Sequence, residues 1–362
     1  MHLPRYLLPA AVLASACLPP AAAAAAKPIP VKAVIVVTFE DGAYTGDKPG
    51  GLQPWAEGEK LDRIVPMPGT FRGDIVMNAD GVVGLVSGRG PINGASSVMA
   101  LGLDPRFDFS KAYWFLTALT GFDPHDASLA SVMWGEWIVD GDWAHEVDAR
   151  ELPADWDTTY FPVHATAPDQ KPAARGSTEL LAVREAYRLN PALSAWAYRL
   201  TKDTPLADTP GMADYRKRFA GFPNAQRPPF VLQGSNLAAG TYWHGVKRTA
   251  WANRWVKLWT DGAGNFVSTS TPDGGRIGAL TALARAGRVD LQRVLQMHAA
   301  MNFSMQAPDM TALESVNYDT PGRPHPGMAP ALASSYAVGS RVLHELVRNW
   351  DRYRDEIPGK AP

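Results

Sequence analysis

The chain has 362 residues, with 35 Lys or Arg and 36 Asp or Glu, so its net charge at pH 7 is -1. A near-neutral chain without basic runs lacks the electrostatic footprint of a nucleic-acid-binding protein, which excludes that class. Hydrophobic residues make up 46% of the chain, which excludes a disordered protein and leaves ample surface to bury.

The first 26 residues are predicted to be a secretory signal peptide. Arg5 supplies a positive start, residues 7–18 are apolar but too short to span a bilayer, and a row of alanines follows. The single cysteine, Cys17, lies in this segment. We favour its removal with the signal; the alternative is a lipid anchor on Cys17. Cleavage predicts a mature protein, residues 27–362, that is periplasmic or secreted.

Strand and helix patterns alternate in the first half of the mature chain. Runs of β-branched and aromatic residues predict buried strands, and glycine- and proline-rich stretches predict loops. We predict strands at 31–39, 81–87, 112–119 and 131–139, a helix at 95–103, and loops at 41–55 and 150–176.

The second half continues this alternation. Asn190 followed by Pro191 predicts a helix start, with the amide as cap and proline at the first helical position. We predict helices at 179–188, 191–200, 241–259, 278–286, 291–297 and 336–353, strands at 230–233 and 264–271, and a proline-dotted insertion at 205–229.

Together these patterns predict one α/β domain over residues 27–362, with a helical and loop insertion near 184–228. The expected architecture has three layers, with a central mixed sheet flanked by helices. Beyond residue 26, no apolar run approaches the 18 residues or so of a membrane span. The mature protein is therefore not expected to span a membrane.

A glycine turn lies between a predicted strand and a predicted helix. Gly88, Arg89 and Gly90 could bring backbone amides close to an anion or a ribose, together with Asn93. A dinucleotide-binding fold would require a third glycine where Asn93 stands, so the pattern argues against NAD. A tight turn without a ligand explains the same residues equally well.

Polar and aromatic side chains are densest after the strand predicted at 230–233. Such a group can hydrogen-bond the edge of a purine or pyrimidine and stack on its face. The alternative, a core tryptophan beside a satisfied histidine, is favoured by spacing alone. The residues concerned are Gln233, Ser235, Asn236, Tyr242, Trp243 and His244.

Other familiar constellations are missing from the sequence. It has no G-x-S-x-G elbow and no P-loop. The pair His344-Glu345 lacks the second histidine of a zinc-binding helix. No metal site is therefore predicted.

Several segments of the sequence are similar to those of a known protein family. Over roughly residues 31–356 the sequence resembles the purine nucleoside permease family, a secreted relative of the nucleoside phosphorylases. The most specific segments are the runs 229–234 (PFVLQG) and 241–245 (TYWHG). Other segments that carry the resemblance are 38–40, 45–47, 51–55, 88–90, 95–102, 121–124, 302–303 and 336–339.

The resemblance implies a nucleoside-phosphorylase-like fold that binds purine nucleosides without a cofactor. It implies an exported protein that assists nucleoside uptake together with a separate membrane transporter. The alternative is a secreted nucleosidase or phosphorylase that cleaves the N-glycosidic bond of purine nucleosides.

The resemblance also suggests catalytic candidates. Glu40 stands where hydrolytic relatives place a water-activating glutamate, but Ser235 replaces the expected aspartate. The family's Met-Glu-Asp motif reads Thr271-Pro272-Asp273 here, so Asp273 is its remaining carboxylate. Because serine cannot protonate a leaving purine, we expect binding to survive these changes and cleavage to be slow.

Overall fold

The computed structural model describes residues 27–172, 185–319 and 325–359. The predicted signal peptide lies outside these residues, so the structure says nothing about it. Among the described residues, none of the helices combines the length and apolar character that a bilayer crossing requires.

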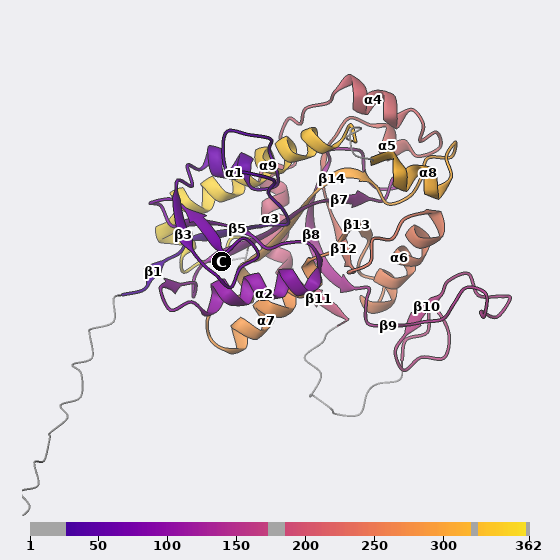
Figure 1. The fold of residues 1–362 in the computed structure, drawn as a ribbon, viewed down its shortest axis with the longest axis horizontal. Helices are drawn as coiled ribbons and strands as arrows, with labels where there is room; N and C mark the ends of the chain where they lie inside the picture. Colours follow the sequence, from indigo (N-terminus) through magenta and orange to yellow (C-terminus); the bar gives the residue numbers. More distant parts are fainter. Residues whose placement is uncertain (1–26, 173–184, 320–324, 360–362) are drawn as a thin grey trace, which may run out of the picture.

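A large mixed sheet forms the centre of the molecule (Figure 1). Its strands follow the order β11-β8-β12-β13-β7-β2-β5-β4-β3, with β14 paired to both β7 and β8. The bounds are β2 (Ala33–Val37), β3 (Arg63–Pro66), β4 (Asp74–Met77), β5 (Val82–Val86), β7 (Tyr113–Phe122), β8 (Val132–Asp140), β11 (Ala186–Arg188), β12 (Val231–Ala238), β13 (Phe266–Ser270) and β14 (Val294–Phe303).

Five of these strands close into a ring. β8 runs parallel to β12, and β12 runs parallel to β13. β13 pairs antiparallel with β7, and β14 bridges the gap by pairing parallel with β7 and antiparallel with β8. The predicted mixed sheet is therefore confirmed, with a closure that the sequence patterns did not indicate.

Helices cover both faces of the sheet, as predicted. In β2, Ile35 and Val37 pack with α1 (Gln53–Gly58), α3 (Pro191–Thr201) and α9 (Met328–Arg348). The alternate residues Val34 and Val36 pack on the opposite face with α2 (Gly90–Leu103) and α7 (Asp273–Arg285). In Figure 1, α1 and α9 lie above the sheet while α2 and α7 lie side by side below it. The strand is buried on both faces, which explains its unbroken β-branched sequence.

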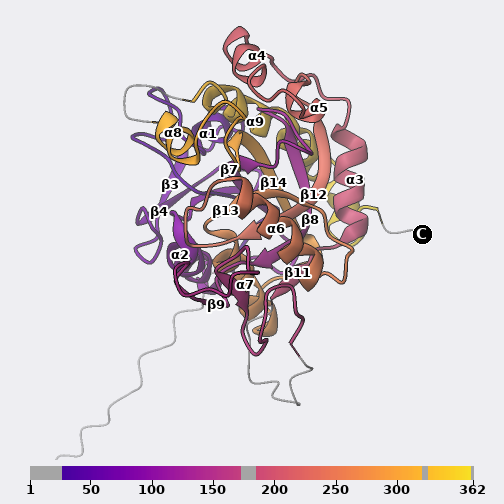
Figure 2. The ribbon, with the colours of Figure 1, turned by 90° about the vertical axis from the view of Figure 1, so that its right-hand side faces the viewer.

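One more helix covers the part of the ring that β12 and β13 form. Helix α6 (Val246–Trp259) lies beside β12 and β13 (Figure 2). Its Trp251 and Trp255 belong to one buried cluster with Leu237 of β12 and Phe266 of β13. It begins five residues later than the predicted helix at 241–259, because Gly245 before it has a φ of 119°. Residues 241–244 are thereby left as an irregular segment beside the ring.

Two predicted helices are wrong. Residues 291–297 form a 3-10 turn (Leu291–Arg293) that leads directly into β14. Residues 294–300 are all buried, so the strand shows no alternation and its apolar spacing imitated a helix. The helix predicted at 179–188 is also wrong where it is described, because Ala186–Arg188 form β11 beside β8; residues 179–184 lie outside the described part.

The other predicted elements are present with shifted ends. The Asn190 side chain accepts hydrogen bonds from the amides of Ala192 and Leu193, which confirms the predicted cap of α3. The insertion predicted near 184–228 contains β11, α3, α4 (Pro210–Arg216) and α5 (Pro223–Gln226). Smaller elements are β1 (Ile29–Pro30), β6 (Phe107–Asp108), β9 (Ala144–Glu146), β10 (Tyr160–Pro162), α8 (Ala312–Val316), a 3-10 turn (Asn317–Asp319) and α10 (Trp350–Tyr353).

Candidate functional site

A cavity of about 360 Å³ opens beside the strand ring. Its wall includes residues 118–121 of β7, 269–270 of β13 and 301–303 of β14. Thr38, which follows β2, and the irregular segment 241–244 complete this side. The volume lies in the range of small-molecule sites, and the walls come from segments far apart in the sequence.

The aromatic block predicted at 242–244 lies in this cavity. The Trp243 ring lines it and is held from behind by Trp251 and Phe266, each with its centroid 5.9 Å away. Tyr242 lines the mouth and is 80% exposed. Trp243 therefore packs on the core and also lines the cavity, where stacking on a ligand stays a prediction.

Two histidines line the cavity in their neutral form. Burial lowers the pKa of His244 to about 4. Burial also lowers the pKa of His325 to about 4. In both rings Nε2 is buried and finds no hydrogen-bond partner in the described part of the chain. Sequence reasoning did not find His325, which belongs to no motif and reaches the cavity from the segment before α9.

The described lining is uncharged at pH 7. It consists of hydroxyl, imidazole, aromatic and aliphatic groups together with the Asn302 amide. Such a surface suits an uncharged ligand that carries a flat ring and several hydrogen-bonding groups. The hydroxyl-bearing residues are Thr38, Thr120, Tyr215, Thr241, Tyr242, Thr269, Ser270, Thr271, Ser304 and Ser315.

The predicted binding residues on β12 support the wall from behind. Asn236 Nδ2 donates a 2.9 Å hydrogen bond to Oγ of Ser270, which lines the cavity. Ser235 and Asn236 are fully buried, and Gln233 Nε2 lies 3.5 Å from Oε1 of Glu136. None of the three is among the described residues that line the cavity. Their predicted direct contact with a ligand is therefore not supported.

The glycine turn is built as a tight strand-to-helix connection. Gly88 and Gly90 have φ values of 83° and 81°, a conformation that favours glycine. The Arg89 guanidinium lies 5.0 Å from the Phe39 ring centroid, and Asn93 Nδ2 donates to the Arg89 carbonyl. The turn meets the cavity only indirectly in the described residues, through the Gly90 amide, which donates to Thr271 Oγ1 at 3.3 Å.

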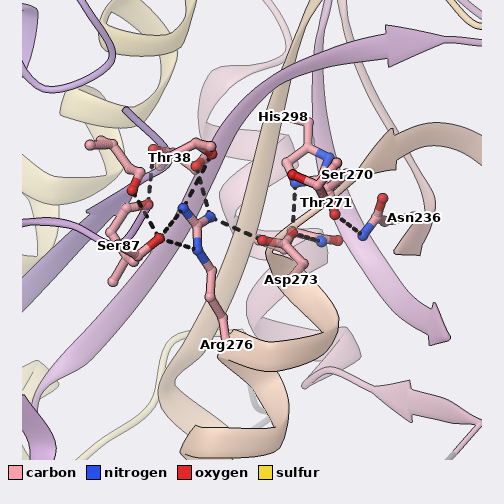
Figure 3. A network of polar contacts seen from close by, with 12 residues as sticks. Thr38, Ser87, Asn236, Ser270, Thr271, Asp273, Arg276 and His298 are labelled. Atoms are coloured by element: carbon pink, nitrogen blue, oxygen red, sulfur yellow. Dashed lines mark hydrogen bonds and ion pairs between the residues drawn. The ribbon is translucent and has the colours of Figure 1, made fainter. Parts of the chain in front are cut away.

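Asp273 lies at the start of α7 with no solvent exposure, and it is the centre of a buried network (Figure 3). Its Oδ1 accepts from Arg276 at 3.0 Å, and its Oδ2 accepts from Gln296 at 2.5 Å and pairs with His298 Nε2 at 2.8 Å. Burial alone would raise the pKa of Asp273, but His298 and then Arg276 outweigh it and lower the pKa. The carboxylate is therefore ionised and fully engaged.

The same network fixes the orientation of the His298 ring. Its Nε2 donates to the Asp273 carboxylate at 2.8 Å. Its Nδ1 lies 2.8 Å from the Ser268 hydroxyl. Ser268, His298 and Asp273 thus form a chain of polar contacts. All three are fully buried, which indicates a structural role.

The guanidinium of Arg276 is also fully hydrogen-bonded within the protein. Its guanidinium donates to Ser87 Oγ through Nε and Nη2, to the Thr117 carbonyl and Asp273 through Nη1, and to Thr38 Oγ1 through Nη2. These bonds use all five donors of a guanidinium. Because Thr38 lines the cavity, Arg276 supports the cavity floor and has no donor left for a ligand.

Glu40 caps a helix. Its carboxylate accepts hydrogen bonds from the backbone amides of Asp41, Gly50, Leu52 and Gln53, at the start of α1. Burial raises the pKa of Glu40, and the four amide bonds oppose that rise. Glu40 and Asp273 both fall outside the described cavity lining. The two predicted catalytic carboxylates therefore accept their hydrogen bonds from other groups of the protein and do not line the cavity.

We expect stability to fall as the pH is lowered from about 6.5 to about 4. An unfolded histidine has a pKa near 6.5, whereas His244 and His325 in the folded protein titrate at about 4. The unfolded chain therefore binds more protons in this window, so unfolding becomes easier. Urea unfolding at several pH values should show a shallower fall in His325→Gln. The exposed control His145→Gln should keep the wild-type slope; an unchanged slope in His325→Gln would contradict the expectation.

Comparison with known proteins gives a consistent set of relatives. A family model described as purine nucleoside permease matches residues 30–358, which confirms the resemblance. A probable purine nucleoside permease of Schizosaccharomyces pombe is 30% identical over 275 residues, covering 74% of this chain and 76% of that protein. A purine nucleoside permease of Candida albicans is 27% identical over 271 residues, covering 74% of this chain and 64% of that protein.

Solved structures similar to this chain are nucleosidases and a hydrolase. One is a 5'-methylthioadenosine/S-adenosylhomocysteine nucleosidase from Colwellia psychrerythraea in complex with adenine, with a TM-score of 0.46 and 13% identity, covering 87% of this chain and 96% of that one. Another is the futalosine hydrolase of Helicobacter pylori, with a TM-score of 0.47 and 10% identity, covering 87% of this chain and 98% of that one.

Proposed function

Since the chain belongs to the purine nucleoside permease family, we propose that it is an exported protein that binds purine nucleosides and assists their uptake. The observation that carries this proposal is the cavity, whose described lining is uncharged and combines aromatic faces with hydroxyls. A purine nucleoside is itself uncharged at pH 7, with a flat base and a sugar rich in hydroxyls. The groups on the two sides are therefore complementary.

Residues on different walls suit different parts of such a ligand. The Trp243 face, or the Tyr242 ring at the mouth, can stack on the base. The hydroxyls of Thr38, Ser270 and Thr271 also line the cavity and suit the sugar. Delivery across a membrane would fall to a separate transporter.

The alternative function is cleavage of the N-glycosidic bond by a nucleosidase or phosphorylase. Cleavage needs a proton donor near the leaving base, and the two imidazoles that line the cavity are the groups suited to that task. The carboxylates of Glu40 and Asp273 are engaged elsewhere. This arrangement favours binding over rapid cleavage.

One experiment separates the two functions. The mature protein is titrated with inosine and adenosine by calorimetry, and the same mixtures are incubated with and without phosphate and analysed for free base. The proposal expects saturable binding with the nucleoside recovered intact. Release of base at ordinary enzyme rates, about 1–10³ per second, would favour the alternative, and absence of binding would contradict both.

Export is tested separately. The predicted signal ends before Lys27, so N-terminal sequencing of protein recovered outside the cytoplasm should begin near that residue. Mass spectrometry of the same material would detect a lipid on Cys17. An intact Met1 terminus in the cytoplasm would contradict the export proposal.

Replacing Trp243 by alanine should weaken nucleoside binding by about one to two decades. Stacking of a base on an aromatic ring contributes about 1–3 kcal/mol, and each 1.4 kcal/mol is tenfold in affinity. The matched control is Trp143→Ala, which removes a tryptophan that is 40% exposed and lies outside the described cavity lining. Unchanged affinity in a folded Trp243→Ala protein would show that the ring only packs on its neighbours.

A further inference from the structure

Two hydroxyls of the cavity lining each accept a hydrogen bond from a side chain behind the wall (Figure 3). Thr38 Oγ1 accepts from Nη2 of Arg276 at 3.2 Å. Ser270 Oγ accepts from Nδ2 of Asn236 at 2.9 Å. A guanidinium and an amide NH₂ group can only donate, so the hydroxyl oxygen is the acceptor in both bonds.

Thr271, which follows Ser270 in the lining, has the same pattern. Its Oγ1 accepts from the backbone amide of Gly90 at 3.3 Å. A hydroxyl that accepts a hydrogen bond still carries a hydrogen of its own to donate. Within residues 27–172, 185–319 and 325–359, none of the three hydroxyls donates to a protein acceptor. Their hydrogens are therefore available to a ligand in the cavity.

We propose that the hydroxyls of Thr38, Ser270 and Thr271 donate hydrogen bonds to oxygen atoms of the ligand's sugar, so that the site selects ribonucleosides over deoxyribonucleosides. This inference rests on the proposed function. A sugar oxygen offers lone pairs to these donors, whereas the hydrogen that replaces it in a deoxy sugar offers none. A deoxy ligand leaves a donor of the site unpaired and binds more weakly.

The charge of Arg276 strengthens the donor at Thr38. A hydroxyl that accepts a hydrogen bond from a cation is polarised and becomes a better donor itself. Nη2 of Arg276 also donates to Oγ of Ser87 at 2.7 Å. Thr38→Val therefore removes the hydroxyl from the cavity without leaving this part of the guanidinium unpaired.

Asn236 is a positioning residue that acts through Ser270. It is fully buried, and its Oδ1 has no hydrogen-bond partner in the described part of the chain. A buried carbonyl left unpaired is unfavourable, so stability alone does not explain an amide at this place in β12. Its bond to Ser270 keeps the oxygen of that hydroxyl turned toward β12 and the hydrogen available to the ligand.

The three donors are tested with variants that remove the hydroxyl and little else, which are Thr38→Val, Ser270→Ala and Thr271→Val. The matched control is Thr166→Val, on an exposed threonine outside the described lining. Thermal unfolding first establishes that each protein is folded. Calorimetry then measures the affinity for inosine, for its 2'-, 3'- and 5'-deoxy analogues and for free hypoxanthine.

Each of the three variants should lose about twofold to tenfold in affinity for inosine, the range that one hydrogen bond implies. The control should match the wild type. The wild type should bind at least one deoxy analogue more weakly than inosine by a similar factor. A variant that lacks the donor for a given oxygen should lose little more when that oxygen is removed, because the two changes delete the same bond.

Asn236→Leu separates positioning from packing. It should weaken inosine binding about twofold to fivefold while the unfolding temperature stays the same or rises, because an unpaired buried carbonyl has been removed. A purely structural residue would lower the unfolding temperature, and unchanged affinity would overturn the positioning role.

The outcomes distinguish this inference from the proposed function. Equal affinity of the wild type for inosine and all three deoxy analogues would overturn the inference and leave the proposed function intact. Losses that are as large for hypoxanthine as for inosine would place the donors on the purine and would also overturn it. A wild-type protein that binds no purine nucleoside would overturn both.

Discussion

Replacing Asp273 by asparagine should lower the free energy of unfolding by about 3–5 kcal/mol, because it leaves a buried guanidinium without its counter-charge. Arg276 and Asp273 are both without solvent exposure, and their ion pair measures 3.0 Å. The asparagine amide would also face N–H donors from Gln296 and His298 where the carboxylate now accepts. Chemical denaturation at pH 7 measures the loss.

A double-mutant cycle tests whether the loss comes from the pair. Arg276→Met alone should be similarly harmful, but Asp273→Asn with Arg276→Met should cost less than the sum, since neither charge is then left unpaired. The matched control is Asp214→Asn. Asp214 pairs with Lys217 at the same i,i+3 spacing, but on the surface, so its replacement should leave the free energy of unfolding nearly unchanged. Additive single effects would contradict a coupled buried pair.

Replacing Glu40 by glutamine should lower the free energy of unfolding by about 2–5 kcal/mol. One carboxylate oxygen becomes an amide that faces backbone N–H donors, and buried donors left unpaired each cost about 1–3 kcal/mol. Gly50, Leu52 and Gln53 all donate to this carboxylate in buried positions. The measurement is again chemical denaturation, with nucleoside affinity determined on the folded fraction.

Glu57→Gln is the control for Glu40, since Glu57 also accepts hydrogen bonds in this region but is exposed. It should change stability little. The contrary outcome is equally clear. If Glu40→Gln keeps its stability while a measurable cleavage of inosine disappears, Glu40 activates water and the alternative function gains its base.

Local sequence signals predicted much of the fold. The unbroken β-branched run in β2 and the Asn190-Pro191 helix start specify their structures within a few residues of sequence. The prediction failed for β14 because a strand buried on both faces has no alternation, and its apolar residues happen to recur at helical spacing. Only its pairing with β7 and β8, distant in sequence, reveals what it is.

The candidate site was predicted less completely than the fold. The local block Tyr242-Trp243-His244 could be found because its residues are adjacent and chemically suggestive. The positions of Asp273 and Glu40 could not, since whether a carboxylate faces a cavity or a buried arginine depends on contacts between distant segments. His325 stands alone in its segment, and only the fold brings it to the cavity wall.

The position of β14 also constrains how this protein folds. The strand lies between β7 and β8 in the ring, although those two follow each other in the chain and β14 comes more than a hundred residues later. The ring cannot close until residues 294–303 have been synthesised and have paired in register with β7 and β8. Such long-range pairing slows folding, and it makes the cavity one of the last features to form. Before that moment, β7 and β8 present unpaired edges, which are the surfaces most open to wrong association.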